Sequence, residues 1–253
     1  MKNNRILVNT KSKSYPIFIG KKNITSIGPL IKKKLPKVKK ICVIVDKNVP
    51  KEILLKLKDS LKKYEIKICK FSVNEKIKNF KIAYKLIEFL IKENFNKSDC
   101  LISLGGGVVG DLSAFVSSLV KRGIKFINIP TTLLAQVDSS IGGKTGVNSD
   151  QGKNLIGTIY QPDFVLIDIS ALKSLPKREM ICGYGEILKH SLILDRKFFF
   201  WLNKNGKKII NFKENNILIN AITKSCKIKS SVVSKDENEK NLRMILNFGH
   251  TFA

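Results

Sequence analysis

The sequence predicts an α/β protein in which an N-terminal domain built on a parallel sheet is followed by a mainly α-helical domain. Between residues 40 and 170, short β-branched runs alternate with helical patterns, and such alternation is typical of a parallel sheet with helices on both faces. Beyond Pro176 the β-like runs give way to helical ones. Because 253 residues exceed the usual size of one domain, we expect an α/β domain over residues 1–174 and the start of a helical domain over residues 175–253.

The spacing of apolar residues predicts the individual elements. Strands are expected over residues 39–46, 65–73, 99–104, 125–130 and 164–170. Helices are expected over residues 50–64 and 77–95, and from the glycines after residue 104 through Val120. In the second half, helical patterns cover residues 178–194, 198–205 and 215–234.

The chain is strongly basic, with 47 lysines and arginines against 20 acidic residues and a formal net charge of +27. Such a charge suits nucleic acids, anionic membranes, or substrates that carry phosphate and carboxylate groups. Only five of the basic residues are arginine, and the lysines are spread along the chain without interleaved aromatic residues. Nucleic-acid readers concentrate both. We therefore interpret most lysines as solvated surface charge and expect no nucleic-acid partner.

The cysteines and the N-terminus indicate the compartment. Five cysteines are widely spaced, and Cys42, Cys69 and Cys100 lie inside apolar strand-like runs, where a thiol acts as a small hydrophobe. Residues 1–10 contain no apolar core of a secretory signal. The apolar stretch 100–120 includes Asp111, four serines and four glycines, which make it a poor membrane span. These features predict a cytoplasmic protein without a membrane partner.

A glycine turn is the strongest local motif. Gly105, Gly107 and Gly110 are spaced as G-x-G-x-x-G, directly after a predicted strand and at the start of a predicted helix, which is the context that binds a pyrophosphate. A tight turn alone is the alternative. No acidic residue stands about twenty positions downstream, where a dinucleotide fingerprint has one, but Asp46 ends an earlier strand. We expect a nucleotide site that departs from the usual Rossmann order.

The segment of residues 129–157 is the most polar and glycine-rich part of the sheet half. Its "GGKT" is not a P-loop, because that motif needs glycine where this chain has Asp138. The segment keeps Lys144, Lys153 and Asn154 among glycines and hydroxyls. It is interpreted as a long loop that presents cations to phosphate or carboxylate groups, with a plain surface loop as the alternative.

Two polar patterns mark the helical half. Glu186 and His190 are four residues apart, on one face of a helix and within reach of a shared metal ion, although this spacing taken alone favours an ordinary helix pair. Arg243, Asn247 and His250 are spaced by four and three, which predicts one polar face of a helix that lines a cavity or a polar seam.

Taken together, these segments resemble the 3-dehydroquinate synthase family. The stretches that carry the resemblance are "GGGVVGDLSAFVSS", "KRGIKFINIPTTLLAQVDSSIGGKTGVN", "GKNLIG", "CGYGEILKH" and "DENEKNLRMILNFGHTF". The family implies an α/β NAD-binding domain followed by a helical domain, with the active site in the cleft between them and a nucleotide site that uses the acid before the glycine turn.

The resemblance also assigns site residues. For NAD it implies Asp46, Asn48, Glu75, Lys78, Gly106, Gly107, Val108, Val109, Gly110, Asp111, Thr131, Thr132, Asp138, Ser139, Lys144, Lys153, Leu172 and Ser174. For the substrate and the chemistry it implies Arg122, Lys144, Lys153, Asn154, Lys189, Lys229, Arg243 and Asn247. The divalent metal, Zn or Co, would be bound by Glu186 and His250, and on this basis His190 is not a ligand.

The family converts 3-deoxy-arabino-heptulosonate 7-phosphate into 3-dehydroquinate and phosphate, with transient reduction of NAD, and the resemblance implies this lyase reaction of the shikimate pathway here. The family sequence continues beyond "GHTF" into further histidines and a substrate lysine. We therefore expect residues 1–253 to be an inactive fragment of a protein that is a homodimer at full length.

Three alternatives stay open. A related sugar-phosphate cyclase would use the same NAD and metal frame on another heptulose or hexose phosphate. An NAD-dependent polyol dehydrogenase of the iron-alcohol type would share the frame but release NADH and need fewer lysines around its substrate. A catalytically dead fragment would bind nucleic acid through its charge, with a steep salt dependence.

Overall fold

The computed structural model describes residues 4–249. Its centre is a seven-stranded sheet with the spatial order β1-β2-β9-β6-β5-β3-β4, in which only the pair β1–β2 is antiparallel. These strands are β1 (Asn4–Asn9), β2 (Ser14–Gly20), β3 (Lys40–Asp46), β4 (Glu65–Phe71), β5 (Cys100–Gly105), β6 (Lys125–Pro130) and β9 (Phe164–Asp168). The predicted α/β class and its mostly parallel sheet are confirmed.

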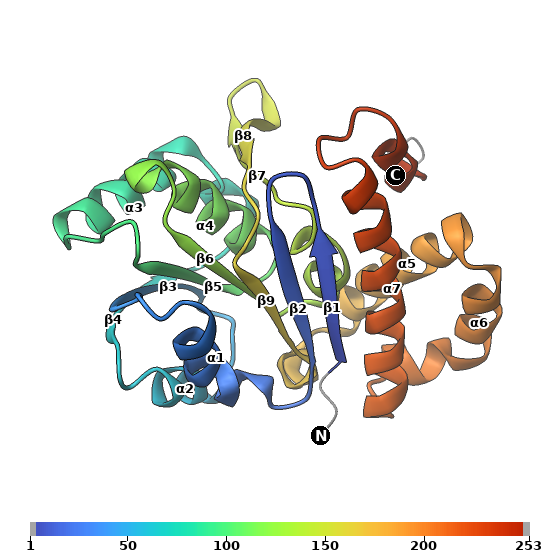
Figure 1. Cartoon of the computed structure of the whole chain (residues 1–253). Coiled ribbons are helices and arrows are strands. Elements are labelled where there is room, and N and C mark those ends of the chain that lie inside the picture. The colour runs from blue at the N-terminus through green and yellow to red at the C-terminus, as the bar shows by residue number, and fades with distance from the viewer. Residues whose placement is uncertain (1–3, 250–253) are drawn as a thin grey trace.

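Helices cover both faces of the sheet (Figure 1). One face carries α1 (Ile27–Lys34) and α2 (Lys51–Ser60), and the other carries α3 (Phe80–Lys92) and α4 (Gly107–Leu119). Strand β3 shows why both faces are apolar. Val43 packs toward α1 and α2 while Ile44 packs toward α3 and α4, as the two-residue period of a strand requires.

The helical part consists of α5 (Lys177–Leu194), α6 (Arg196–Ile210) and α7 (Asn215–Lys235), beside the β1–β2 edge of the sheet (Figure 1). These helices share a core with that edge, in which Phe198 and Cys226 pack with Ile17 and Ile167. The predicted boundary between residues 174 and 175 stays a prediction. None of the helices within residues 4–249 combines the length and apolar character needed to cross a membrane.

Side chains fix several helix starts. Asn79 accepts a hydrogen bond from the amide of Ile82 at 2.9 Å at the start of α3, and Asp195 accepts one from Phe198 at 2.8 Å at the start of α6. Such N-caps satisfy amides that have no partner within the helix.

Two sequence interpretations of local structure were wrong. The polar segment 129–157 is not one long loop, because it contains a π-helical turn, η4 (Ala135–Ser139), and an antiparallel hairpin of β7 (Lys144–Ser149) and β8 (Gly152–Ile159). Glycines permit the hairpin: a Cβ on Gly157 would lie 2.2 Å from the carbonyl oxygen of Thr145. A strand with glycines and an exposed surface carries little of the apolar alternation that identifies strands.

The second error concerns the polar helix face near the C-terminus. Residues Leu242–Asn247 form a 3₁₀ helix, η6, and not an α-helix. With three residues per turn, side chains four apart do not share a face. Arg243 is therefore buried while Asn247 is exposed. His250, the third member of that predicted face, lies outside the described residues.

Candidate active site

The glycine turn lies at the carboxyl edge of the sheet, where β5 ends and α4 begins. Gly105 ends the strand, Gly106 is the N-cap and Gly107 is the first helical residue, so the predicted strand–turn–helix arrangement is present. Added Cβ atoms would crowd this turn: one on Gly105 would lie 2.8 Å from Val109, and one on Gly107 would lie 3.1 Å from Ser139 Oγ. The helix N-terminus therefore offers bare amides to an anion.

A cavity of about 660 Å³ opens above this turn. Eight of the residues assigned to NAD line it: Asp46, Asn48, Gly106, Gly107, Val108, Thr131, Thr132 and Ser174. Asp46 and Asn48 come from the end of β3, and Thr131 and Thr132 follow β6. The neighbouring ends of these parallel strands thus bring together residues that are far apart in the sequence.

Two residues assigned to NAD have side chains in the protein interior. Val109 packs in the core between the sheet and α4, and Leu172 packs in the core beside α5. Neither side chain lines the cavity. Any contact that Val109 makes with a nucleotide would come from its backbone, because its side chain is committed to packing.

A second cavity, of about 610 Å³, lies between the β7–β8 hairpin, η4 and α7. It collects the predicted site residues Asp111, Asp138, Ser139, Lys144, Asn154, Lys229 and Arg243. Three cations and one amide therefore converge on one space, although they come from the hairpin, α7 and η6. Such a cavity suits a small molecule with more than one anionic group.

Asp138 and Lys229 form an ion pair at this second cavity. Burial alone would raise the pKa of Asp138, but the Lys229 ammonium outweighs it and holds the pKa at about 2. Asp138 therefore remains a carboxylate at any physiological pH. Burial lowers the pKa of Lys144, and the nearby Arg243 and Lys229 lower it further.

A cluster of Lys78, Asp111 and Asn154 connects the second cavity to the segment that precedes α3. The Lys78 ammonium lies 2.5 Å from Asp111 Oδ2 and also contacts Asn154 Oδ1. Burial raises the pKa of Asp111 despite Lys78, which opposes the shift. Asn154 has a φ of 58°, a strained conformation that this contact holds in place. Glu75 accepts a hydrogen bond from Asn148 at 2.8 Å on the hairpin.

The residues around Glu186 fit a divalent metal. Glu186 Oε1 and His190 Nε2 lie 3.1 Å apart, and both are buried without an aligned hydrogen-bond partner among residues 4–249. Asp138, Glu186 and His190 each offer a ligand atom within 4.8 Å of the others. A donor set of carboxylate oxygens and an imidazole nitrogen is one that Zn²⁺ and Co²⁺ accept. His250 cannot be placed in this cluster, since it lies outside the described residues.

Four of the residues assigned to substrate do not line either cavity. Arg122 and Lys153 are exposed. Lys189 donates to the carbonyl of Leu246 at 2.7 Å and pairs with Glu186 Oε2 at 2.8 Å. Asn247 is exposed and donates to Glu239 Oε1 at 3.0 Å.

Glu239 is the residue that sequence reasoning missed. It is half-buried, contacts the Lys144 ammonium and accepts a hydrogen bond from Asn247. It thus links the hairpin to η6 at the rim of the cationic cavity. The available signal was the acidic stretch "DENE" in a chain with only 20 acidic residues.

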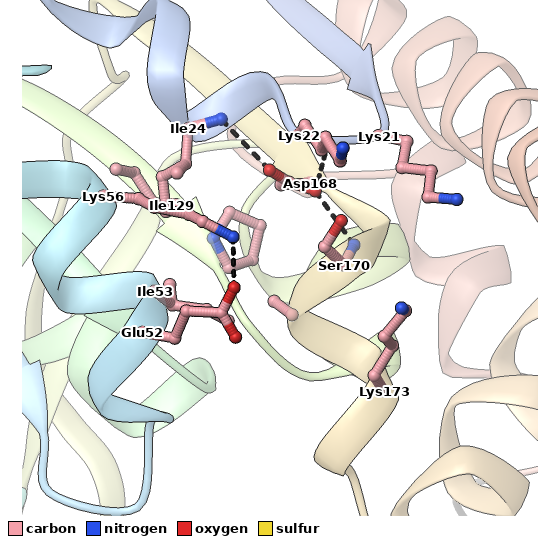
Figure 2. A pocket seen from close by; sticks show the side chains of 12 residues that line it. Lys21, Lys22, Ile24, Glu52, Ile53, Lys56, Ile129, Asp168, Ser170 and Lys173 are labelled. Carbon is pink, nitrogen blue, oxygen red and sulfur yellow. Dashed lines mark hydrogen bonds and ion pairs between the residues drawn. The ribbon is translucent and has the colours of Figure 1, made fainter.

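A smaller cavity of about 270 Å³ lies beside the glycine-turn cavity, and Ala171 lines both. Figure 2 shows Lys21, Lys22, Lys56 and Lys173 around it, with Lys56 paired to Glu52. Asp168 accepts backbone hydrogen bonds from Lys22, Ile24 and Ser170 there. None of the residues predicted for the site lines this cavity.

Comparison with known proteins extends these observations. The sequence profile of the 3-dehydroquinate synthase N-terminal domain matches residues 68–182, and that of the C-terminal domain matches residues 183–253. The 3-dehydroquinate synthase of Pelagibacter ubique is 52% identical over 249 residues, which are 98% of this chain and 67% of that protein. The enzyme of the same name from Thermodesulfovibrio yellowstonii is 44% identical over 98% of this chain and 69% of its own length.

Solved structures show the same fold. A 2-deoxy-scyllo-inosose synthase, solved with carbaglucose-6-phosphate, NAD⁺ and Co²⁺, has a TM-score of 0.88 at 28% identity, covering 98% of this chain and 67% of its own. The 2-epi-5-epi-valiolone synthase of Streptomyces hygroscopicus, solved with NAD⁺ and Zn²⁺, has a TM-score of 0.86 at 25% identity, covering 96% and 67%.

The chain therefore has the fold of the sugar-phosphate cyclases, with a mostly parallel sheet beside helices that carry acidic and cationic groups. Within that class, the sequence matches are specific. The chain belongs to the 3-dehydroquinate synthase family.

Proposed function

We propose that the chain carries the binding sites of a 3-dehydroquinate synthase, with NAD in the glycine-turn cavity and 3-deoxy-arabino-heptulosonate 7-phosphate in the cationic cavity. The observation that carries this proposal is the convergence of Lys144, Lys229 and Arg243 on one cavity beside Asp138. A substrate with a carboxylate and a phosphate matches that charge, and membership of the 3-dehydroquinate synthase family supports the proposed reaction.

The residues that line the glycine-turn cavity would hold NAD at the carboxyl edge of the sheet, and the bound cofactor would supply reversible hydride transfer. The amides at Gly106 and Gly107 would hold its pyrophosphate, because they stand at the N-terminus of α4. Asp46 would accept hydrogen bonds from ribose hydroxyls. Thr131 and Thr132 would close the opposite wall.

A divalent ion bound at Glu186 would stabilise negative charge on the substrate hydroxyl that is oxidised. We propose Glu186 and His250 as ligands. Lys189 orients Glu186, since its ammonium holds Oε2 while being fixed on the Leu246 carbonyl. Asp138 stays ionised, and its carboxylate oxygen lies within 4.8 Å of a carboxylate oxygen of Glu186. Its negative charge therefore favours binding of the divalent cation beside Glu186.

The cations hold the substrate's anionic groups. Arg243 is rigid, because its Nη1 donates to the carbonyls of Gly142 and Glu237 at 3.0 and 2.6 Å. Lys144 is less enclosed, since its side chain is 57% exposed and reaches from β7 to the Glu239 carboxylate. We propose that Arg243 fixes the position of one anionic group while Lys144 follows the departing phosphate.

A substrate panel tests this function. The purified chain, supplied with NAD and Co²⁺, is titrated in a calorimeter with the heptulosonate phosphate, with glucose 6-phosphate and with glycerol, and products are then analysed. We expect tight, NAD-dependent binding of the heptulosonate phosphate alone. Preferential binding of the hexose phosphate would favour a different cyclase. Accumulation of NADH from glycerol would favour a polyol dehydrogenase. An iron-containing alcohol dehydrogenase of Thermotoga maritima shares the fold of this chain (TM-score 0.70 at 18% identity).

Two further proposals concern the setting of the enzyme. We propose a cytoplasmic location, which suits five cysteines that are all free in the structure. We also propose that the protein forms a homodimer, which sedimentation at several protein concentrations tests directly.

A further inference from the structure

His190 is a buried titratable group that the proposed reaction does not use. It lies on α5, one helical turn beyond Glu186, and is wholly buried. Its Nδ1 lies 2.6 Å from the hydroxyl of Ser225 on α7, so the ring is anchored from a second helix. Its Nε2 lies 3.1 Å from Glu186 Oε1. The ring therefore stands between the packed interior and the carboxylate that we assign to the metal.

The two atoms that face each other have no other partner. Neither Glu186 Oε1 nor His190 Nε2 has an aligned hydrogen bond within residues 4–249, and a buried polar atom without a partner costs free energy. Hydrogen bonds of catalytic groups are often poorly aligned without ligands and tighten when the ligand binds. The 3.1 Å separation needs only a small rotation of the carboxylate to become such a bond.

The second oxygen of Glu186 is already fixed. Lys189 holds Oε2 at 2.8 Å, so the carboxylate is supported by one residue on each oxygen. If the Ser225 hydroxyl donates to Nδ1, the proton of the neutral ring is on Nε2 and points toward Glu186. Carboxylates that bind metals are commonly hydrogen-bonded in this way, and the partner sets their orientation.

We propose that His190 is a positioning residue: its Nε2–H donates a hydrogen bond to Glu186 Oε1, and the ring, anchored by Ser225, aims the carboxylate at the divalent metal. This inference rests on the proposed metal at Glu186. In this role His190 makes no bond to the metal. The role requires only a hydrogen-bond donor to Glu186 at the position of His190 Nε2.

Substitutions separate this role from the alternatives. His190→Gln places an amide N–H near the Nε2 position, whereas His190→Phe fills the space without a donor. Co²⁺ affinity is measured by titration of the purified 253-residue chain, with its visible absorption spectrum and its thermal midpoint recorded for each variant. Ser191→Ala is the matched control, since Ser191 is also buried on α5 but donates only to the carbonyl of Leu188.

We expect His190→Phe to weaken Co²⁺ binding by about 10–100-fold, as loss of an outer partner of a metal ligand does. His190→Gln should restore the affinity to within about threefold and leave the Co²⁺ spectrum unchanged, and Ser191→Ala should behave as wild type. Unchanged affinity in His190→Phe would reduce His190 to a packing residue. An equal loss in both His190 variants, with a changed spectrum, would make it a direct ligand. Either result overturns the inference.

The variant Glu186→Gln distinguishes a wrong assignment of the metal site from a wrong role for His190. If Glu186→Gln binds Co²⁺ as tightly as wild type, the metal is not at Glu186, and both the metal assignment and the role of His190 are wrong. If Glu186→Gln abolishes binding while His190→Phe does not alter it, only the inference about His190 fails.

Discussion

The Lys229 ammonium donates to both the backbone carbonyl of Asp138, at 2.8 Å, and to its carboxylate, which ties α7 to the turn η4. The two residues are 91 positions apart in the sequence. This contact places a permanent negative charge beside Glu186 and a cation beside the substrate cavity. A residue of the helical part and a residue of the turn after β6 thus meet at the proposed active site.

Replacing Lys229 with methionine tests this contact. The Asp138 carboxylate would lose its counter-charge, so its pKa should rise and the free energy of unfolding should fall. We expect a loss of about 2 kcal/mol, below the roughly 3–5 kcal/mol of a fully buried pair, because the Asp138 side chain is 33% exposed. Urea unfolding measures the change. Lys227→Met, an exposed change on the same helix, should stay within about 0.5 kcal/mol.

A side chain at Gly106 should weaken nucleotide binding. A Cβ at Gly106 would lie 3.1 Å from Thr132 Cγ2, on the wall of the proposed NAD cavity. We expect Gly106→Val to raise the Kd for NAD at least about tenfold, because the pyrophosphate needs close approach to the backbone. Calorimetry measures this Kd. Gly185→Ala, whose Cβ meets nothing within 4 Å, should leave it unchanged.

Arg243 should act on the substrate and not on the nucleotide. Its guanidinium is buried and held by two backbone carbonyls, a geometry that a lysine ammonium cannot reproduce. We expect Arg243→Lys to weaken binding of the heptulosonate phosphate by roughly 10–100-fold, the effect of one lost hydrogen bond to a charged group. NAD affinity should not change. An equal loss of both affinities would contradict the separation of the two cavities.

The Glu237 carboxylate should make the free energy of unfolding depend on pH in the acidic range. Burial raises its pKa, but hydrogen bonds from Ser12 and Gln161 outweigh this and hold the pKa below the usual 4.5. A lowered pKa means that the contribution to stability is complete above pH 4.5 and is lost as the pH falls through the lower folded value. We therefore expect wild type to exceed Glu237→Gln in stability at pH 7, with the difference shrinking below pH 4.5. Urea midpoints across that range measure it, and a constant difference would be contrary to this expectation.

The alternation of strands and helices between residues 40 and 170 was readable because buried parallel strands such as β3 and β5 are continuous apolar runs. The hairpin of β1 and β2 was not identified. Its strands contain arginine, asparagine and proline, and the pairing of β2 with β9 joins segments about 150 residues apart. Such long-range pairing supplies the stability that local propensity does not show.

The sequence identified individual residues of the site but not the contacts between them. Motifs identified Lys78, Asp111 and Asn154 separately, yet their contact depends on how α4 and the hairpin pack, which no local pattern encodes. Glu239 was missed for the same reason. The spacing of Glu186 and His190 was noticed, but only the structure shows Ser225 behind the ring.

The most direct test of the account is a crystal structure of the chain grown with NAD and Co²⁺, with the ion located by its anomalous scattering. We expect the pyrophosphate to bind the amides of Gly106 and Gly107 and the ion to bind Glu186. The second cavity, which Arg243 lines, should remain free for the substrate. An NAD molecule in another cavity, or an ion that does not contact Glu186, would contradict the account.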